Sequence, residues 1–247
     1  MFENKKFTGL SIIMPAFNEG ENIAHSVEEV LAYSKKLHDM NMSFEVLVVN
    51  DGSDDNTPDI INRLALEYPQ EVVAINNSRN SGYGYSIAKA IEKSRYDLVF
   101  FTDADRQFKI GSLDLLLPLM FTGIPDIVIG YRLDRKDPAL RKFLSWGFNS
   151  LVRFIFDINV KDIDCAFKLF RKEIFKKIEI GSNNFFINTE ILTKAGFFNF
   201  RILEVGVEHF PRGTGKSTVS LKYIPLTLME LVKIWKIMQG LKRKRNP

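Results

Sequence analysis

Four continuous apolar segments in the first half of the chain alternate with segments of helical periodicity. This alternation limits the possible folds more than any other feature. The apolar segments span residues 7–15, 44–50, 71–76 and 96–103. Between them, apolar side chains recur at helical spacing in residues 20–39, 57–68 and 86–94. Apolar strands separated by helices are typical of an α/β fold, in which helices cover both faces of a mostly parallel sheet.

Each of the four apolar segments ends in a polar cluster. In chain order the clusters are MPAFNEGEN, VVNDGSDDNT, NNSRNSGYG and FFTDADRQF. Parallel strands place their carboxyl ends at one edge of the sheet, and sheets of this kind bind ligands there. A single polar turn after a strand is ordinary. Four clusters rich in acids and amides instead predict one binding site at that edge.

Asp103 and Asp105 in the fourth cluster carry the clearest chemistry. Residues two apart in an extended chain point the same way and lie about 6–7 Å apart along the backbone. Two such carboxylates can bind one cation, and Gln107 could add an amide oxygen. Oxygen ligands favour Mg²⁺ or Mn²⁺ over zinc, and such an ion is commonly shared with substrate phosphates. The alternative is a solvated turn that happens to be rich in aspartate.

Two glycine-rich stretches resemble nucleotide-binding motifs but lack essential positions. GTGKST ends like a P-loop, but the first glycine of that motif would fall on Phe210, and Pro211 has no N–H to offer a phosphate. SGYGYS carries Ile87 where a dinucleotide fingerprint needs its third glycine. We therefore expect neither an ATPase loop nor a dinucleotide site. Arg212 and Lys216 beside the first stretch still suit a phosphate ligand.

Composition excludes several classes of protein. The 247 residues carry 34 Lys and Arg against 30 Asp and Glu, a net charge of +4. Because basic and acidic residues are interspersed and no recognition motif occurs, we expect no nucleic-acid partner. A single cysteine, Cys165, excludes an internal disulfide and suits a reducing compartment. No apolar run reaches the about 18 residues of a membrane span, and the N-terminus does not resemble a signal peptide. These features predict a cytoplasmic protein.

Three motifs together resemble the family 2 glycosyltransferases. They are PAFNEGENI (15–23), VVNDGSDDNT (48–57) and TDADRQF (102–108). The resemblance covers nearly the whole chain and is greatest to the dolichol-phosphate mannose synthase-like, or polyprenyl-phosphate glycosyltransferase, branch. It implies the GT-A fold, which is Rossmann-like, with a mostly parallel central sheet between helices. It also implies metal-dependent, inverting transfer of a hexose, with mannose or glucose favoured, from a GDP- or UDP-sugar to polyprenyl or dolichyl phosphate.

The resemblance also divides the chain and assigns donor-site roles. Residues 1–222 would form one catalytic domain, with a nucleotide-sugar half at 1–108 and an acceptor half at 109–222, before an amphipathic basic tail at 223–247. The nucleotide pocket would be lined by Pro15, Ala16, Asn18 and Glu19. The nucleobase or ribose would contact Asp51, Gly52 and Ser53.

The D-x-D motif of the family matches Asp103, Ala104 and Asp105, which would bind the metal and the donor diphosphate, with Gln107 as a further ligand. PRGTGKS matches the late R-x-x-G-x-S segment of the family. Arg212 and Lys216 would therefore close over the diphosphate. Together with the cation, these positive charges would stabilise the nucleoside diphosphate as it leaves.

The acceptor is expected in the second half of the chain. The lipid phosphate would be bound by Arg132, Arg141, Lys142 and Ser145. A phosphate monoester is largely dianionic at neutral pH and can attack without a protein base. Glu190 is a candidate base, with a structural role in the first turn of a helix as the favoured alternative. The chain departs from the family pattern at Cys165 and Ala166, where serine and glycine are more usual, and at Asn50, where an acid often stands.

Two amphipathic segments predict binding to a membrane surface. One is a helix over residues 140–156, which carries a broad apolar surface bordered by basic residues. The other spans residues 226–245 and ends in four basic residues, which anionic lipid attracts. We therefore expect peripheral association with the cytoplasmic face of a membrane. Packing within the protein, for the first segment, and a solvated terminus, for the second, are the alternatives.

Two other functions remain open on the sequence alone. One is a GT-A transferase that acts on a soluble saccharide or protein acceptor. The other is a non-catalytic scaffold that binds a nucleotide-sugar. The intact D-x-D motif argues against the second. A requirement for a lipid acceptor would distinguish the first from the leading hypothesis.

Overall fold

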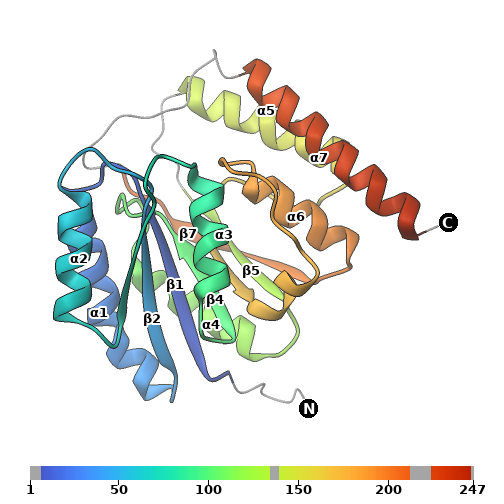
Figure 1. Ribbon diagram of the computed structural model, residues 1–247. Coiled ribbons are helices and arrows are strands. Elements are labelled where there is room, and N and C mark those ends of the chain that lie inside the picture. Colours follow the sequence, from blue (N-terminus) through green and yellow to red (C-terminus); the bar gives the residue numbers. More distant parts are fainter. Residues whose placement is uncertain (1–6, 134–138, 212–223, 246–247) are drawn as a thin grey trace.

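The computed structural model describes residues 7–133, 139–211 and 224–245. A seven-stranded sheet runs through the molecule in the order β3-β2-β1-β4-β6-β5-β7 (Figure 1). The strands are β1 (Gly9–Ala16), β2 (Ser43–Asn50), β3 (Val72–Asn76), β4 (Leu98–Thr102), β5 (Ile127–Leu133), β6 (Phe167–Arg171) and β7 (Ile202–Glu208). β6 runs antiparallel to its neighbours β4 and β5, and the other strand pairs are parallel. The predicted mostly parallel sheet is confirmed.

Helices cover both faces of the sheet, as predicted. On one face lie α1 (Ile23–Asp39), α2 (Thr57–Glu67) and α4 (Leu113–Phe121), and on the other lie α3 (Tyr83–Lys93) and α6 (Ile187–Phe197). Two further helices, α5 (Ala139–Phe156) and α7 (Ile224–Arg245), lie side by side on the outside of α6 (Figure 1). Short 3-10 helices span Ile110–Ser112 and Lys172–Lys176.

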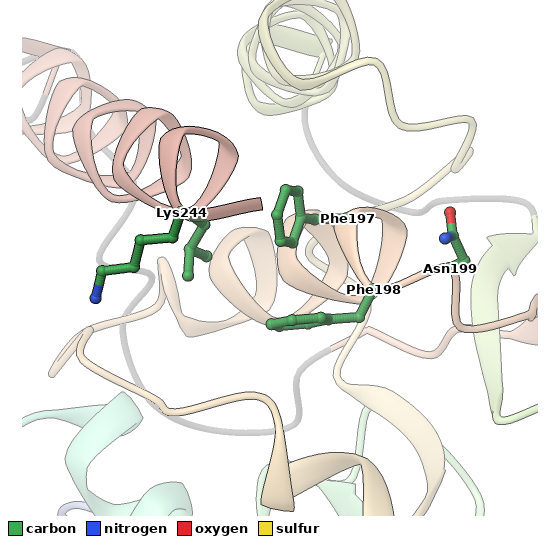
Figure 2. A pocket seen from close by; sticks show the side chains of 5 residues that line it. Phe197, Phe198, Asn199 and Lys244 are labelled. Atoms are coloured by element: carbon green, nitrogen blue, oxygen red, sulfur yellow. The ribbon is translucent and has the colours of Figure 1, made fainter. Parts of the chain in front are cut away.

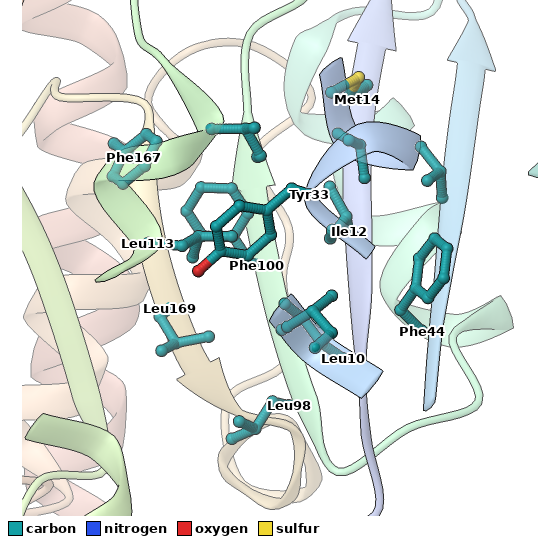
Figure 3. Close-up of a cluster of buried hydrophobic side chains, with 14 of the residues drawn as sticks. Leu10, Ile12, Met14, Tyr33, Phe44, Leu98, Phe100, Leu113, Phe167 and Leu169 are labelled. Carbon is teal, nitrogen blue, oxygen red and sulfur yellow. The ribbon is translucent and has the colours of Figure 1, made fainter. Parts of the chain in front are cut away.

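Strands β1, β2 and β4 are mostly apolar because both of their faces are buried. Successive side chains of a strand point to opposite faces. In β1, Leu10, Ile12 and Met14 pack in the layer under α1 and α4, as Figure 3 shows, whereas Ile13 packs in the layer under α3. A one-residue slip of this strand would still bury apolar side chains, so its register is set by its neighbours on both sides.

The outer helices pack on the body through Val152 of α5 and Leu231 of α7, which belong to the core layer of α3 and α6, and through a smaller cluster. Ile234 and Met238 of α7 pack with Phe148 and Phe156 of α5 and with Phe197 of α6. The other sides of α5 and α7 therefore face away from the core. Within the parts of the chain that the structure describes, no helix is both long enough and apolar enough to cross a membrane.

Candidate active site

The loops after β1 and β2 meet at the carboxyl edge of the sheet. Asn18, whose φ of 55° is left-handed, accepts a hydrogen bond at Oδ1 from the backbone N–H of Asp54 (2.9 Å). Its own N–H donates to Ser53 Oγ (2.9 Å), and the N–H of Glu19 donates to Thr57 Oγ1 (3.0 Å). The first two motifs thus form one hydrogen-bonded unit. It includes Asn18, Glu19 and Ser53 of the predicted nucleotide pocket.

Asp51 holds the loop that follows β3. Its buried carboxylate accepts hydrogen bonds from Asn77 Nδ2 (2.9 Å), the N–H of Ser81 (2.9 Å) and the N–H of Gly82 (2.8 Å). Gly52 has a φ of +70°, and a Cβ there would lie 2.3 Å from the backbone of Arg79. The third polar cluster is therefore tied to the second. The predicted contact of Asp51 with a nucleobase or ribose stays a prediction.

Backbone and small residues connect the D-x-D motif to the rest of the site. Ala104 is buried, and its carbonyl accepts a hydrogen bond from Ser26 Oγ of α1 (2.8 Å). Pro15 and Ala16 are buried at the end of β1, next to β4. Because both residues are buried, they could contribute to the predicted nucleotide pocket only by shaping its wall.

Asp103 and Asp105 follow β4 directly, where the sheet ends. Asp105 is buried and accepts a hydrogen bond at Oδ1 from the N–H of Gln107 (3.1 Å). Arg106, which lies between Asp105 and Gln107, has a left-handed φ of 61°, which turns the chain sharply after the strand. Left-handed backbone at residues other than glycine is uncommon and concentrates at functional sites. Asn18 and Arg106 both stand at this edge.

The donor set of this loop fits a hard divalent cation. Two carboxylates stand at residues 103 and 105, and Gln107 donates from Nε2 to the carbonyl of Phe210 (3.2 Å), so Oε1 is the amide atom left to bind a cation. Across residues 7–133, 139–211 and 224–245, no group of three or more His, Cys, Asp and Glu side chains is placed to hold a metal. A cation here would therefore need further oxygens from phosphate or water, as Mg²⁺ commonly does.

Tyr83 belongs to this site but was not singled out from the sequence. It is the first residue of α3, and its hydroxyl is buried without a hydrogen bond to any described residue. Burial, and after it the negative charge of Asp103, raise the pKa of Tyr83 well above its ordinary value. The only sequence signal was the glycine pair around it. A Cβ on Gly84 would lie 2.2 Å from the carbonyl of Ser182, so these glycines permit close approach of the 181–184 loop.

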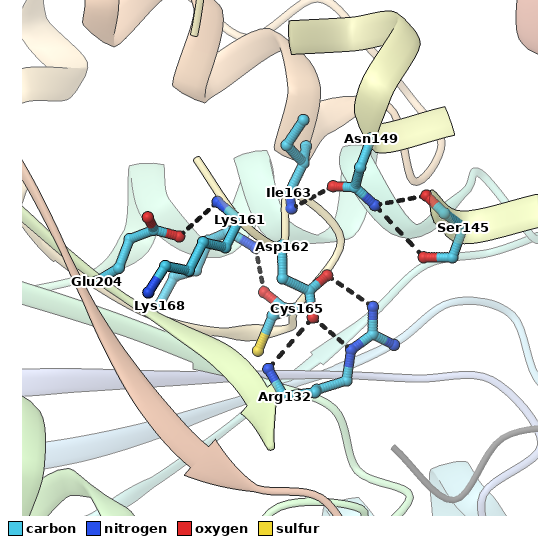
Figure 4. Close-up of polar contacts among 9 residues, drawn as sticks. All are labelled: Arg132, Ser145, Asn149, Lys161, Asp162, Ile163, Cys165, Lys168 and Glu204. Carbon is cyan, nitrogen blue, oxygen red and sulfur yellow. Dashed lines mark hydrogen bonds and ion pairs between the residues drawn. The ribbon is translucent and has the colours of Figure 1, made fainter. Parts of the chain in front are cut away.

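Arg132, a predicted acceptor residue, forms a buried ion pair. Its Nε and one terminal nitrogen each donate to an Asp162 carboxylate oxygen at 2.7 Å, and the two side chains are 7% and 9% exposed (Figure 4). Burial alone would lower the pKa of Arg132, but the hydrogen bonds and charge of Asp162 raise it above its ordinary value. The guanidinium therefore stays charged, and the partner that the sequence did not reveal lies 30 residues along the chain.

The Asp162 loop also reaches α5. The N–H of Ile163 donates to Asn149 Oδ1 (2.8 Å), and Asn149 Nδ2 donates to the carbonyl of Ser145 (2.8 Å), as Figure 4 shows. The structure thus joins two of the predicted acceptor residues, Arg132 and Ser145, in one network. Lys142 lies on the same helix and is exposed. The side chain of Arg141 lies outside the described residues.

Cys165 and Lys168 lie beneath this loop and are closed to solvent. Burial, and after it the charge of Asp162, raise the pKa of the Cys165 thiol to about 12. Lys168 Nζ donates to the carbonyl of Cys165, and burial lowers the pKa of the lysine. The thiol therefore stays protonated at neutral pH and is not a nucleophile.

Glu190 has a structural role, which was the favoured alternative. Its carboxylate is fully buried and accepts hydrogen bonds from the N–H of Ser182 (2.8 Å), the N–H of Gly181 (3.1 Å) and Lys194 Nζ (2.7 Å). It fixes the loop that covers the start of α3. A carboxylate held by three donors is a poor general base.

Two predicted diphosphate ligands, Arg212 and Lys216, lie outside the described residues. The chain before them is anchored at the site, because the N–H of Phe210 donates to the carbonyl of Gln107 (2.9 Å). A cavity of about 390 Å³ lies elsewhere, between the ends of α6 and α7 (Figure 2). It is lined by Phe197, Phe198, Asn199, Leu241 and Lys244, none of which belongs to the strand-end loops.

Comparison with known proteins places the chain in a family. The model of glycosyl transferase family 2 matches residues 11–179. A dolichyl-phosphate beta-glucosyltransferase of Trichomonas vaginalis is 32% identical over 245 residues, which cover 92% of this chain and 76% of that protein. An undecaprenyl-phosphate 4-deoxy-4-formamido-L-arabinose transferase of Yersinia enterocolitica is 27% identical over 232 residues, which cover 94% of this chain and 69% of that protein.

The fold is shared with a solved glycosyltransferase. Glucosyl-3-phosphoglycerate synthase of Mycobacterium tuberculosis, crystallised with Mn²⁺, UDP and glucosyl-3-phosphoglycerate, superposes with a TM-score of 0.62. Identity is 17%, over 97% of this chain and 81% of that one. The same enzyme was also crystallised with Mg²⁺ and UDP, and that structure superposes with a TM-score of 0.64 at 16% identity over 84% of this chain and 73% of that one. The chain therefore belongs to glycosyl transferase family 2 and is a glycosyltransferase with the GT-A fold.

Proposed function

We propose that this enzyme transfers a hexose from a GDP- or UDP-sugar to polyprenyl phosphate, with inversion, at the carboxyl edge of the sheet. One observation carries the proposal. Thr102 of β4 pairs with Phe167 of β6, so Asp103 and Asp105 lie beside the loop that contains Asp162. The donor loop after β4 thus lies beside the loop whose Asp162 carboxylate holds Arg132, the proposed acceptor residue of β5. The two sequence relatives described above are named for dolichyl and undecaprenyl phosphate, which supports a lipid phosphate as acceptor.

The chain supplies the donor half of the reaction from three loops. Asp103, Asp105 and Gln107 would hold Mg²⁺ or Mn²⁺, an ion that supplies positive charge to a leaving diphosphate. Asn18, Glu19 and Ser53 hold the first two loops in one unit, in which a nucleotide can be bound without further ordering. We propose that Arg212 and Lys216 close over the diphosphate.

The acceptor needs orientation more than activation. An oxygen of the dianionic phosphate attacks the anomeric carbon, and the bond from that carbon to the donor diphosphate breaks with its electron pair on the diphosphate. No proton has to be removed, which agrees with the structural roles of Glu190 and Cys165. We assign the acceptor phosphate to Arg132, Arg141, Lys142 and Ser145. Among the described contacts, Arg132 uses Nε and one terminal nitrogen, so its other terminal nitrogen can still donate to phosphate.

A transfer assay tests this function. Purified enzyme is given UDP-glucose or GDP-mannose, Mg²⁺ or Mn²⁺, and either detergent-solubilised polyprenyl phosphate or a soluble sugar acceptor. We expect a lipid-linked product from one donor, no product in EDTA, and a β-linkage because the donor is α-linked. Transfer to the soluble acceptor alone would replace this proposal with the soluble-acceptor alternative. Donor binding without any transfer would support the scaffold.

An exposed apolar surface suits the lipid acceptor. We call it the α5–α7 surface and define it by Phe143, Trp146 and Phe154 of α5, and Met229, Val232 and Trp235 of α7. Phe154 is 87% exposed, and Phe143 and Trp146 are each 64% exposed. Lys142 borders it on α5, and Lys233 and Lys236 border it on α7. Large apolar side chains beside basic ones are the pattern of a helix that lies in an anionic membrane interface. We propose that the enzyme docks there.

Replacing Phe143 and Phe154 by serine is expected to weaken binding to phosphatidylcholine–phosphatidylglycerol vesicles by about tenfold or more, since burial of one large apolar side chain contributes about 1.5–3 kcal/mol. Flotation of the protein with the vesicles measures the effect. Leu66→Ser is the matched control, because Leu66 is 83% exposed on α2, on the opposite face of the sheet. Equal loss in the control, or no loss in the double variant, would contradict the proposed docking.

A further inference from the structure

The Tyr83 hydroxyl is buried and makes no hydrogen bond of ordinary geometry, yet it lies within reach of the Asp103 carboxylate, whose charge and hydrogen-bonding oxygen raise the pKa of the tyrosine. We propose that Tyr83 is a positioning residue, whose hydroxyl donates a hydrogen bond to Asp103 when that carboxylate binds the cation. The inference rests on the proposed function, because it takes Asp103 and Asp105 as the metal-binding pair. It assigns Tyr83 no direct contact with the donor or the acceptor.

The backbone around Tyr83 is held from two sides. From the sheet, the Asp51 carboxylate accepts hydrogen bonds from the N–H groups of Ser81 and Gly82. From the opposite side, the carbonyl of Asn183 accepts from the N–H groups of Gly84 (2.9 Å) and Tyr85 (3.2 Å). The first turn of α3 is thus clamped between two loops. The backbone of Tyr83 therefore cannot move away from the carboxylates without breaking these bonds.

Packing does not account for a tyrosine at this position. A buried hydroxyl without a partner destabilises a protein by about 1–3 kcal/mol, whereas phenylalanine would fill the same space without that cost. The hydroxyl is accounted for if the nearby Asp103 carboxylate turns one oxygen toward it when the site is loaded. A carboxylate that gives one oxygen to a cation leaves the other oxygen to accept a hydrogen bond, which fixes its orientation. Asp103 is the neighbour whose charge acts most strongly on this hydroxyl.

Tyr83→Phe separates positioning from packing. Mn²⁺ binding is measured directly, from the electron paramagnetic resonance of free Mn²⁺, with UDP and with GDP in separate titrations. We expect the dissociation constant for Mn²⁺ to rise about 10–100-fold, which is the usual effect of losing a partner of a metal ligand. The melting temperature of the metal-free protein is expected to stay the same or to rise.

Two further variants complete the experiment. Tyr85→Phe is the matched control, because Tyr85 lies two residues along the same helix and is 41% exposed, and neither measurement should change. Asp105→Ala should abolish Mn²⁺ binding and so identify the site. If wild type binds Mn²⁺ through Asp105 and Tyr83→Phe binds it equally well, the inference is wrong and the proposed function stands. If wild type does not bind Mn²⁺, or Asp105→Ala binds it normally, the proposed function fails. A lower melting temperature of metal-free Tyr83→Phe would show that the hydroxyl is structural.

Discussion

Asp105→Ala is expected to lower the turnover number of metal-dependent hexosyl transfer by about a hundred- to a thousandfold, since loss of one group that stabilises developing charge commonly costs 10²–10³. Asp105 stands at the end of β4, where Gln107 fixes its carboxylate (3.1 Å). Loss of this carboxylate would remove one of the two carboxylates that are proposed to share the ion. The transfer assay at saturating donor and acceptor measures the effect.

The fold should survive this substitution. Asp105 lies beyond the last residue of β4, outside the strand pairs, and neighbouring carboxylates repel each other when no cation lies between them. We therefore expect little change in the melting temperature of the metal-free protein. Asp105→Asn, which keeps the volume, should lose turnover to a similar degree. Asp114→Ala, which removes an exposed carboxylate of α4, is the control and should remain active. Retained turnover of Asp105→Ala in EDTA would show that the site is assigned wrongly.

The first half of the fold could be predicted because its signals are local. The segment at 46–49 is apolar at every position since Val46 and Val48 pack on one face of the sheet while Leu47 and Val49 pack on the other. The carboxylates two residues apart likewise follow from strand geometry alone. The direction of β6 could not be predicted, because FKLFR is buried along its whole length and gives the same pattern in either direction.

The site contacts that the sequence did not reveal join residues that lie far apart in the chain. Asp51 was predicted to contact the nucleotide, and the described hydrogen bonds of its carboxylate go to residues 26 to 31 positions away. Tyr83 reaches Asp103 through a turn whose shape depends on Asp51 and on the 181–184 loop. No pattern within the strand or the helix encodes these contacts. They follow from the strand order of the sheet.

Arg132 is the clearest case, because the sequence shows an arginine suited to phosphate and the structure shows it paired. Asp162→Ala leaves the Arg132 guanidinium buried without the carboxylate that balances its charge. We expect the free energy of unfolding to fall by about 3–5 kcal/mol, the usual result of removing one member of a buried ion pair. Urea unfolding measures it. Lys36→Ala removes one member of an exposed pair with Asp114 and keeps the hydrogen bond from Tyr33 to Asp114, so it should cost no more than about 1 kcal/mol.

Replacing both members of the pair separates stability from acceptor binding. In Arg132→Met with Asp162→Leu no charge is left buried, so most of the lost stability should return. Activity should not return if Arg132 also donates to the acceptor phosphate: the KM for polyprenyl phosphate would stay raised while donor binding is normal. Full recovery of both stability and acceptor KM would limit Arg132 to a structural role. A double variant no more stable than Asp162→Ala would contradict the ion-pair argument. The lost stability would then come from the loop that contains Asp162, which is attached to α5 by the hydrogen bond from Ile163 to Asn149.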